Sequence, residues 1–153
     1  MKKFILALLV VTAGYWLQQT SSRAPESERA FRTVQSSPST SAFADDTLAR
    51  AYEQQLSNLQ VQGEGEVIKV LKDDTQGRRH QRFLLKLASG QTILIAHNVD
   101  LAPRIASLRE GDRVAFHGEY EWNDKGGVIH WTHHDPDGRH TAGWLEHSGR
   151  RYR

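Results

Sequence analysis

The chain has 153 residues, of which 38% are hydrophobic, and it contains no cysteine. This length suits one domain with extensions, and the lack of cysteine excludes disulfides, thiolate metal sites and a lipid anchor on cysteine. The formal charge is +2, but residues 61–137 hold ten Lys or Arg against twelve acids and residues 138–153 hold four Arg against one Glu, so the folded body is slightly acidic and duplex nucleic acid is not an expected partner.

The N-terminal residues predict export. Lys2 and Lys3 precede an apolar run of about fourteen residues, which is close to the length of a signal segment and short of the ~20 residues that span a bilayer. Two alternatives remain for residues 1–17. They are either a signal peptide that is removed by cleavage near Ser21–Ala24, or an N-terminal anchor that is retained. We expect a periplasmic protein, one anchored in the inner membrane and facing the periplasm, or a secreted one, with membrane contact only through this segment.

Two further segments precede the predicted barrel. Residues 18–44 are rich in Ser, Thr, Gln, Pro and Ala, a composition that predicts a disordered linker. Residues 45–60 predict an amphipathic helix, which we expect to begin at Asp45-Asp46-Thr47 because carboxylates favour the first turn. Its apolar positions recur at helical spacing, at Leu48, Ala51, Tyr52, Leu56 and Leu59.

From residue 61 onwards the apolar period changes to two, which predicts strands. We expect five of them, at 61–71, 81–87, 92–97, 113–122 and 128–134, with a bulge or tight bend at Gly63 and Gly65. A turn and a short helix are expected within 98–110. This order predicts an all-β, OB-like barrel over 61–137, a small five-stranded and partly open architecture; a β-sandwich, which would need about seven strands, is the alternative.

Residues 138–153 form a basic C-terminal arm, anchored by Trp144, Leu145 and Tyr152. We expect either an extra hairpin or an arm packed on the barrel.

Several short motifs carry a resemblance to a known family. They are His130–Pro136 (HWTHHDP), Gly138-Arg139-His140, Gly143-Trp144, His80–Phe83, Ala96–Asn98, Ala102–Arg104 and Gly118–Tyr120. Together they resemble a family of small exported bacterial proteins that is catalogued only as a domain of unknown function. The resemblance covers about residues 63–152 and implies no activity.

The last two predicted strands could place imidazoles and carboxylates on one outer face. If Trp122 pairs with Ile129 and Tyr120 with Trp131, then His117 lies beside His134, Glu119 beside Thr132 and Glu121 beside His130. Imidazole and carboxylate suit a divalent transition metal such as zinc. The predicted metal donors on this face are His117, Glu119, His130 and His134, and a second group at the strand's end is His133, Asp135 and His140. A solvated face with Glu–His pairs is the alternative.

A second candidate site lies around the first hairpin loop, which flanks the ligand groove in OB folds. Arg78, His80 and Arg82 could hold phosphate or carboxylate, although a solvated loop would have the same composition. His97 and Asn98, at the end of the third strand, and the exposed Trp144 complete the predicted ligand-binding residues; capping a turn is the alternative for His97 and Asn98. Tyr120, Trp122 and Trp131 could stack on a ligand, but core packing fits their spacing better.

The sequence supports three functions and assigns no reaction. The first is an exported, monomeric, OB-like binding module for a small polar or anionic ligand or an envelope partner. The second is a metal-dependent hydrolase, for example a phosphodiesterase, that would use a metal-bound water on the histidine-rich face. The third is a structural envelope protein. Barrels of this kind host many functions, so the fold does not choose among them.

Overall fold

A computed structural model describes residues 40–153, with side chains from residue 45. Within this part of the chain, one helix precedes seven strands: α2 (Thr40–Glu53), β1 (Leu59–Val70), β2 (His80–Lys86), β3 (Thr92–Asn98), β4 (Arg113–Glu121), β5 (Val128–His130), β6 (Trp144–His147) and β7 (Arg150–Tyr152). No described helix has the length and apolar character needed to cross a membrane. The predicted signal or anchor segment and most of the predicted linker lie outside the described residues.

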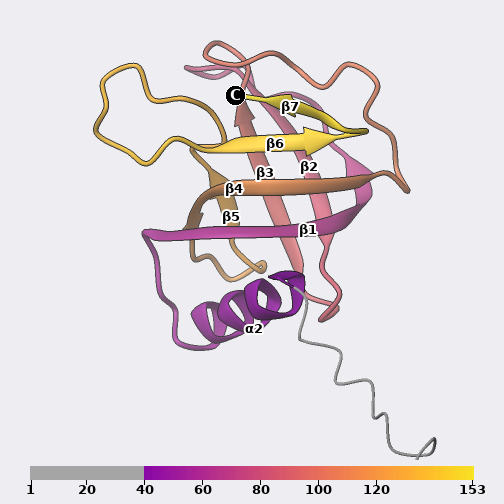
Figure 1. Cartoon of the computed structure of the whole chain (residues 1–153), viewed down its shortest axis with the longest axis vertical. Coiled ribbons are helices and arrows are strands. Elements are labelled where there is room, and N and C mark those ends of the chain that lie inside the picture. The colour runs from indigo at the N-terminus through magenta and orange to yellow at the C-terminus, as the bar shows by residue number, and fades with distance from the viewer. Residues whose placement is uncertain (1–39) are drawn as a thin grey trace, which may run out of the picture. The chain divides into compact units, whose positions relative to one another are not determined.

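The first five strands close into a barrel. Their order is β1-β2-β3-β5-β4, and an additional antiparallel pairing joins β4 to β1. The pairing of β3 with β5 is parallel, whereas the others are antiparallel. In Figure 1, β1, β4, β6 and β7 lie one above another and cross over β2, β3 and β5. The OB-like five-stranded barrel is therefore confirmed.

The barrel core follows from the alternation of apolar residues along each strand. On β2, β3 and β4 every second side chain is buried, so one side of each strand faces inwards. The inward-facing residues include Phe83, Leu85, Ile93, Ile95, Phe116 and Tyr120, all fully buried. Burial of this continuous apolar surface stabilises the closed sheet.

Of the two alternatives that we expected at Gly63 and Gly65, a bulge or a tight bend, the bulge is not found there. Both glycines stay in register with Phe116 and Val114 on β4, and the irregularity in β1 lies between Val67 and Lys69. A Cβ atom on Gly65 would come within 2.8 Å of the Lys86 carbonyl oxygen. Gly65 is thus required where β1 and β2 approach each other closely.

Helix α2 closes one end of the barrel. It begins before Asp45, so our predicted start was wrong: Asp45 lies within the helix, is buried, and accepts a hydrogen bond from the Ser89 backbone N–H in the β2–β3 turn. Leu48 and Ala51 join the barrel core. Helix and barrel therefore share one core.

The segment between β3 and β4 covers the opposite end. We expected a short helix here, but the segment folds as turns. The side-chain amide of Gln81 bonds to both the N–H and the carbonyl of Ile105, and His97 donates to the carbonyl of Pro103. Side chains thus form hydrogen bonds with backbone N–H and carbonyl groups that would bond to each other in a helix. In addition, Pro103 disfavours the helical conformation in the residue before it.

The fourth and fifth strands pair two residues away from the register that we predicted. Tyr120 pairs with Ile129, and Glu119 pairs with His130. Strand β5 also ends at His130 rather than 134, because Trp131 adopts a left-handed backbone conformation, with φ of 51°. Since the shift is by two residues, the side chains of β4 and of residues 128–130 keep the faces that we assigned to them, but their neighbours change. Beyond His130 the assignment was wrong for Thr132, which we placed on the outer face and which is fully buried.

The C-terminal arm forms a hairpin of the sheet. Strand β6 pairs with the first half of β4, and β7 pairs with β6. Ser148 and Gly149 both have positive φ, as the two-residue turns that suit twisted strands require. Leu145 and Tyr152 are buried in the common core, so the hairpin is fastened to the barrel by packing as well as by hydrogen bonds.

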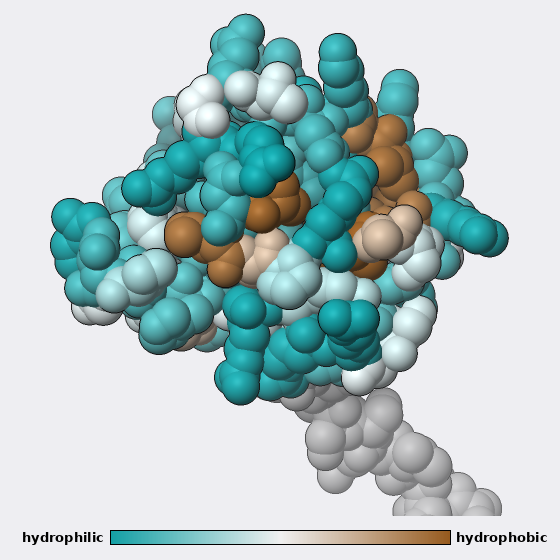
Figure 2. All heavy atoms as spheres, turned by 90° about the horizontal axis from the view of Figure 1, so that it is seen from above, coloured by the Kyte–Doolittle hydropathy of each residue, from teal (hydrophilic) through white to brown (hydrophobic). Residues whose placement is uncertain are grey.

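Within the described part of the chain, exposed apolar residues are scattered over the surface and do not form a large patch. Figure 2 shows one face that is mostly hydrophilic, with hydrophobic residues in small separate groups. The exposed large apolar side chains of the described residues are Tyr52, Leu56 and Ile68, which lie in or near α2 and on β1.

Candidate functional site

A small pocket opens at the end of the barrel opposite α2, where β2 begins and where β3 and β5 end. Its volume is about 240 Å³. The lining residues are Arg78, His80, Ala96, Asn98, His130, Trp131 and His133. The structure therefore brings together three residues that we predicted as ligand-binding, Arg78, His80 and Asn98, and two that we predicted as metal donors, His130 and His133.

The left-handed conformation of Trp131 gives the pocket one of its walls. We favoured core packing for this side chain, but it is only partly buried and stacks on His140, with ring centroids 3.6 Å apart and an interplanar angle of 13°. Backbone conformations of this kind are costly for large residues and persist where the surroundings impose them. Gly118 and Gly143 help to impose it, since a Cβ atom on either would lie within 2.5 Å of the carbonyl oxygen of His130 or Trp131, respectively.

Arg78 and Asn98 give the pocket two side chains with unpaired hydrogen-bond donors. The guanidinium of Arg78 has no partner within residues 45–153, and the side-chain nitrogen of Asn98 is likewise unbonded there, because only its Oδ1 atom is used, by the Asp100 N–H. His133 donates from Nδ1 to the carbonyl of His134 at 2.7 Å, so in the neutral ring its Nε2 atom is a hydrogen-bond acceptor. Among the described residues, no carboxylate lines the pocket.

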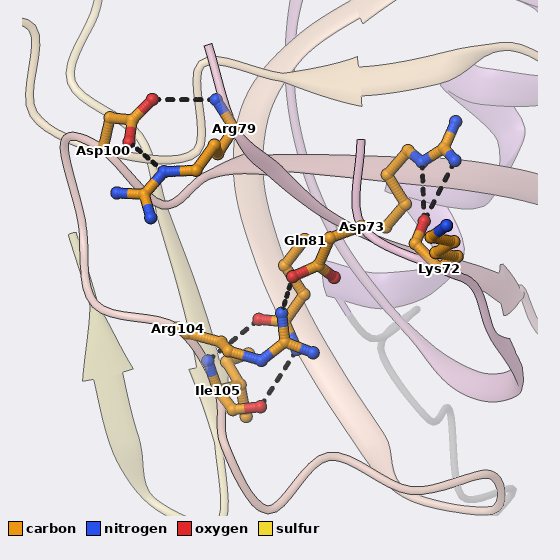
Figure 3. A network of polar contacts seen from close by, with 8 residues as sticks. Lys72, Asp73, Arg79, Gln81, Asp100, Arg104 and Ile105 are labelled. Atoms are coloured by element: carbon orange, nitrogen blue, oxygen red, sulfur yellow. Dashed lines mark hydrogen bonds and ion pairs between the residues drawn. The ribbon is translucent and has the colours of Figure 1, made fainter. Parts of the chain in front are cut away.

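The neighbouring arginines are already occupied, as Figure 3 shows. Arg79 binds Asp100 through its backbone N–H and its Nε atom at 2.8 and 2.7 Å, and these bonds hold the pKa of Asp100 below its usual value. Arg104 pairs with Asp73, and Arg82 donates twice to the Lys72 carbonyl. Arg82, which we predicted as a ligand residue, is therefore used within the protein, and Arg78 is the arginine of this region left for a ligand.

His97 belongs to the core rather than to the pocket. It is fully buried, and both of its ring nitrogens are bonded, to Thr132 and to Pro103. Burial lowers its pKa to about 4, so the ring is neutral at physiological pH. It joins the end of β3 to two other segments and has no free atom for a ligand.

Asp135 organises the loop after β5. Its carboxylate accepts hydrogen bonds from the backbone N–H groups of Asp137, Arg139 and His140. Burial acts to raise its pKa, but these bonds outweigh burial and hold the pKa below its usual value. Asp135 is thus a turn former that positions His140, and the predicted group of His133, Asp135 and His140 does not share a point where a metal could sit among them.

The outer face of β4 and β5 does gather imidazole and carboxylate. Glu119, Glu121 and His130 each offer one ligand atom, and these three atoms lie within 4.8 Å of one another. His130 Nε2 is 3.7 Å from Glu119 and 4.0 Å from Glu121, and His140 Nδ1 is 3.4 Å from the other oxygen of Glu119. Burial lowers the pKa of His130 although both glutamates act to raise it, which favours the neutral ring.

The other predicted residues lie elsewhere. His117 pairs with Trp144 across β4 and β6 and contacts Gln60 at 3.1 Å. Trp144 is covered by the guanidinium of Arg151, 4.1 Å from the ring centroid. His134 is exposed in the loop. These three do not join the pocket or the Glu119–Glu121–His130 group.

Sequence reasoning missed two members of these groups. Glu121 was absent from the predicted metal donors, although alternation placed it on the correct face and our register placed it beside His130. Trp131 was assigned to the core from the same alternation. The residues next to Trp131 do not predict its positive φ, because the glycines that help to impose it, Gly118 and Gly143, lie more than ten residues away in the sequence.

Comparison with known proteins assigns the chain to a family but does not indicate an activity. A family described as "Protein of unknown function (DUF3465)" matches residues 32–153, which confirms the resemblance seen in the sequence. A comparison with curated proteins found no match.

Proposed function

We propose that this chain, which belongs to the DUF3465 family of proteins of unknown function, is a non-enzymatic binding module for a small anion that carries phosphate or carboxylate. The observation that supports this function is the composition of the pocket: an unpaired arginine and an amide NH₂ group line it, and no carboxylate of the described residues does. Arginine recognises both anions through its planar pair of N–H donors.

The size of the pocket favours a small group. A volume of about 240 Å³ is below the range of ~300–1,000 Å³ that is typical of drug-sized ligands. The partly exposed ring of Trp131 adds an apolar wall, so the anionic group could carry a small organic part. The pocket would then bind one charged end of a molecule rather than enclose it.

Titration of the purified full chain with inorganic phosphate tests the proposal. We expect a saturable rise in melting temperature, because a ligand that binds the native state stabilises it by RT ln(1 + [L]/Kd). Arg78→Ala should weaken phosphate binding at least tenfold. Arg153→Ala removes the same charge from the C-terminal residue and should leave binding unchanged. Equal loss in both variants, or no effect of phosphate beyond that of potassium chloride at equal ionic strength, would refute the proposal.

We also propose that the protein is exported, with a periplasmic or membrane-anchored location. The support is Lys2-Lys3 followed by the apolar run to Leu17. Fractionation of cells that express the chain with a C-terminal tag tests this; recovery in the cytoplasm would contradict it. Replacement of both lysines by glutamate should impair export, whereas the same change at Arg150 and Arg151 should not.

A further inference from the structure

The group formed by Glu119, Glu121 and His130 has the composition of a metal site. Glu119 and Glu121 are two residues apart on β4 and so lie on one face, and the observed register puts His130 directly opposite Glu119. We propose that these three side chains bind one divalent transition-metal ion, with zinc as the ion that best suits one imidazole nitrogen and two carboxylate oxygens. The site shares His130 with the anion pocket, whereas Glu119 and Glu121 do not line the pocket.

The ring nitrogen of His130 is placed as a ligand atom without a partner. Its Nε2 atom is shielded from solvent and makes no hydrogen bond within the described residues. A shielded polar atom without a partner is costly, and the nearest acceptors, at 3.7 and 4.0 Å, are beyond hydrogen-bonding distance. A cation between the three groups would satisfy it.

The charges around the group also favour a cation. Other glutamates on the strands pair with arginine: Glu64 pairs with Arg113 at 2.7 Å and Glu146 with Arg151 at 3.0 Å. Glu119 and Glu121 have only imidazoles beside them within residues 45–153. Two neighbouring carboxylates repel each other, and a divalent cation would remove that repulsion.

The distances are close to those of a bound ion. Two ligand atoms at ~2.05 Å from a tetrahedral zinc ion lie roughly 3.3 Å apart. The two separations from His130, 3.7 and 4.0 Å, exceed this value by less than 1 Å, and the two glutamate oxygens lie within 4.8 Å of each other. Side-chain rotation can close differences of this size.

His140 supplies the outer support that metal ligands usually have. Its Nδ1 atom faces the second oxygen of Glu119 at 3.4 Å, and its ring is fixed by stacking on Trp131. Its backbone N–H is held by Asp135. Hydrogen bonds of this kind orient a carboxylate ligand and raise metal affinity. His130 belongs both to this group and to the lining of the pocket, so a bound ion would lie beside a bound anion.

Metal titration of the tag-free full chain, after EDTA treatment and dialysis, tests the site. We expect one Zn²⁺ per chain by calorimetry, and with Co²⁺ the visible absorption of a site of low coordination number. Glu121→Gln should weaken Zn²⁺ binding at least tenfold. Glu64→Gln, which removes the same charge from the outer face of β1, should not. Equal melting temperatures of the two metal-free variants would show that both fold.

The opposing results are equally definite. Absence of stoichiometric Zn²⁺ or Co²⁺ binding, equal affinity in Glu121→Gln and Glu64→Gln, or loss of the metal in His117→Gln with retention in Glu121→Gln would overturn the proposal. Arg78→Ala should keep Zn²⁺ binding, and Glu121→Gln should keep phosphate binding in the presence of EDTA. Failure of the metal site and failure of the anion pocket would therefore be seen separately.

Discussion

The hydroxyl of Thr132 lies 2.8 Å from Nδ1 of His97 and donates a hydrogen bond to it. The assignment follows from the other ring nitrogen, Nε2, which must carry the proton because its partner, the carbonyl of Pro103 at 3.2 Å, can only accept. The neutral ring thus joins the end of β3 to the chain after β5 and to the loop that covers the barrel. Protonation at Nδ1 would break the first of these bonds within the core.

We expect this histidine to make stability fall as the pH falls from about 6.5 to 4. Burial lowers the pKa of His97 to about 4 in the folded protein, against the ordinary histidine value of 6.5 that holds in the unfolded chain. Between these values the unfolded chain binds more protons, so stability rises with pH. The free energy of unfolding should drop by about 3 kcal/mol across this window. Urea unfolding at a series of pH values measures it.

The control is His97→Gln, which keeps an amide donor and acceptor but does not titrate. The variant should lose less stability than the wild type between pH 6.5 and 4. Part of the loss that remains comes from His130, whose pKa is also lowered. Asp100, Asp112 and Asp135 have pKa values below the usual 3.8. Their stabilisation is present above that value and disappears at lower pH, so the two effects separate. Identical pH profiles for the variant and the wild type would contradict the role of His97.

Asp135→Ala should loosen the loop after β5. Three backbone N–H groups would lose their acceptor, and hydrogen bonds to a charged group contribute about 1.5–3 kcal/mol each at most. We expect a destabilisation of about 2 kcal/mol or more and faster amide hydrogen exchange at Asp137, Arg139 and His140. Asp137→Ala, an exposed position two residues later, should leave exchange at Arg139 and His140 nearly unchanged. Unaltered exchange in Asp135→Ala would contradict the organising role.

Gly143→Ala should be far more damaging than Gly138→Ala. A Cβ atom at 143 would lie 2.0 Å from the carbonyl oxygen of Trp131 and 2.4 Å from that of His117, both backbone atoms that cannot rotate away. At 138 no described residue beyond the two chain neighbours lies within 4 Å, and the cost is that of a positive φ of 65°, about 1 kcal/mol. We expect a loss of several kcal/mol at 143, measured by chemical unfolding. Similar losses at the two positions would contradict the close approach.

Leu48→Ala and Leu56→Ala test whether α2 is part of the core. Leu48 is fully buried and Leu56 is 41% exposed. Truncation of a buried leucine costs about 2–5 kcal/mol, whereas a surface substitution usually changes stability by less than about 0.5 kcal/mol. A small effect of Leu48→Ala would contradict the packing of α2 into the barrel core.

Much of the fold could be predicted because alternation is a local signal. Phe83, Leu85, Ile93 and Ile95 recur at every second position and are buried as expected. The helix between β3 and β4 was mispredicted because the apolar residues Ile105 and Leu108 fit either a helix or a buried loop. What decides between them is Gln81, a side chain on another strand that binds Ile105.

The sequence by itself determined which residues of β4 face the core and which face outwards, because successive side chains of a strand point to opposite sides. Only the tertiary structure decided that Glu119 meets His130 and that Trp131 borders a pocket. These contacts depend on the register of β4 and β5 and on the positive φ of Trp131, which are set where the chain passes close to Gly118 and Gly143. Such close approaches occur between segments that are separated along the chain. The local pattern of apolar and polar residues therefore does not predict them.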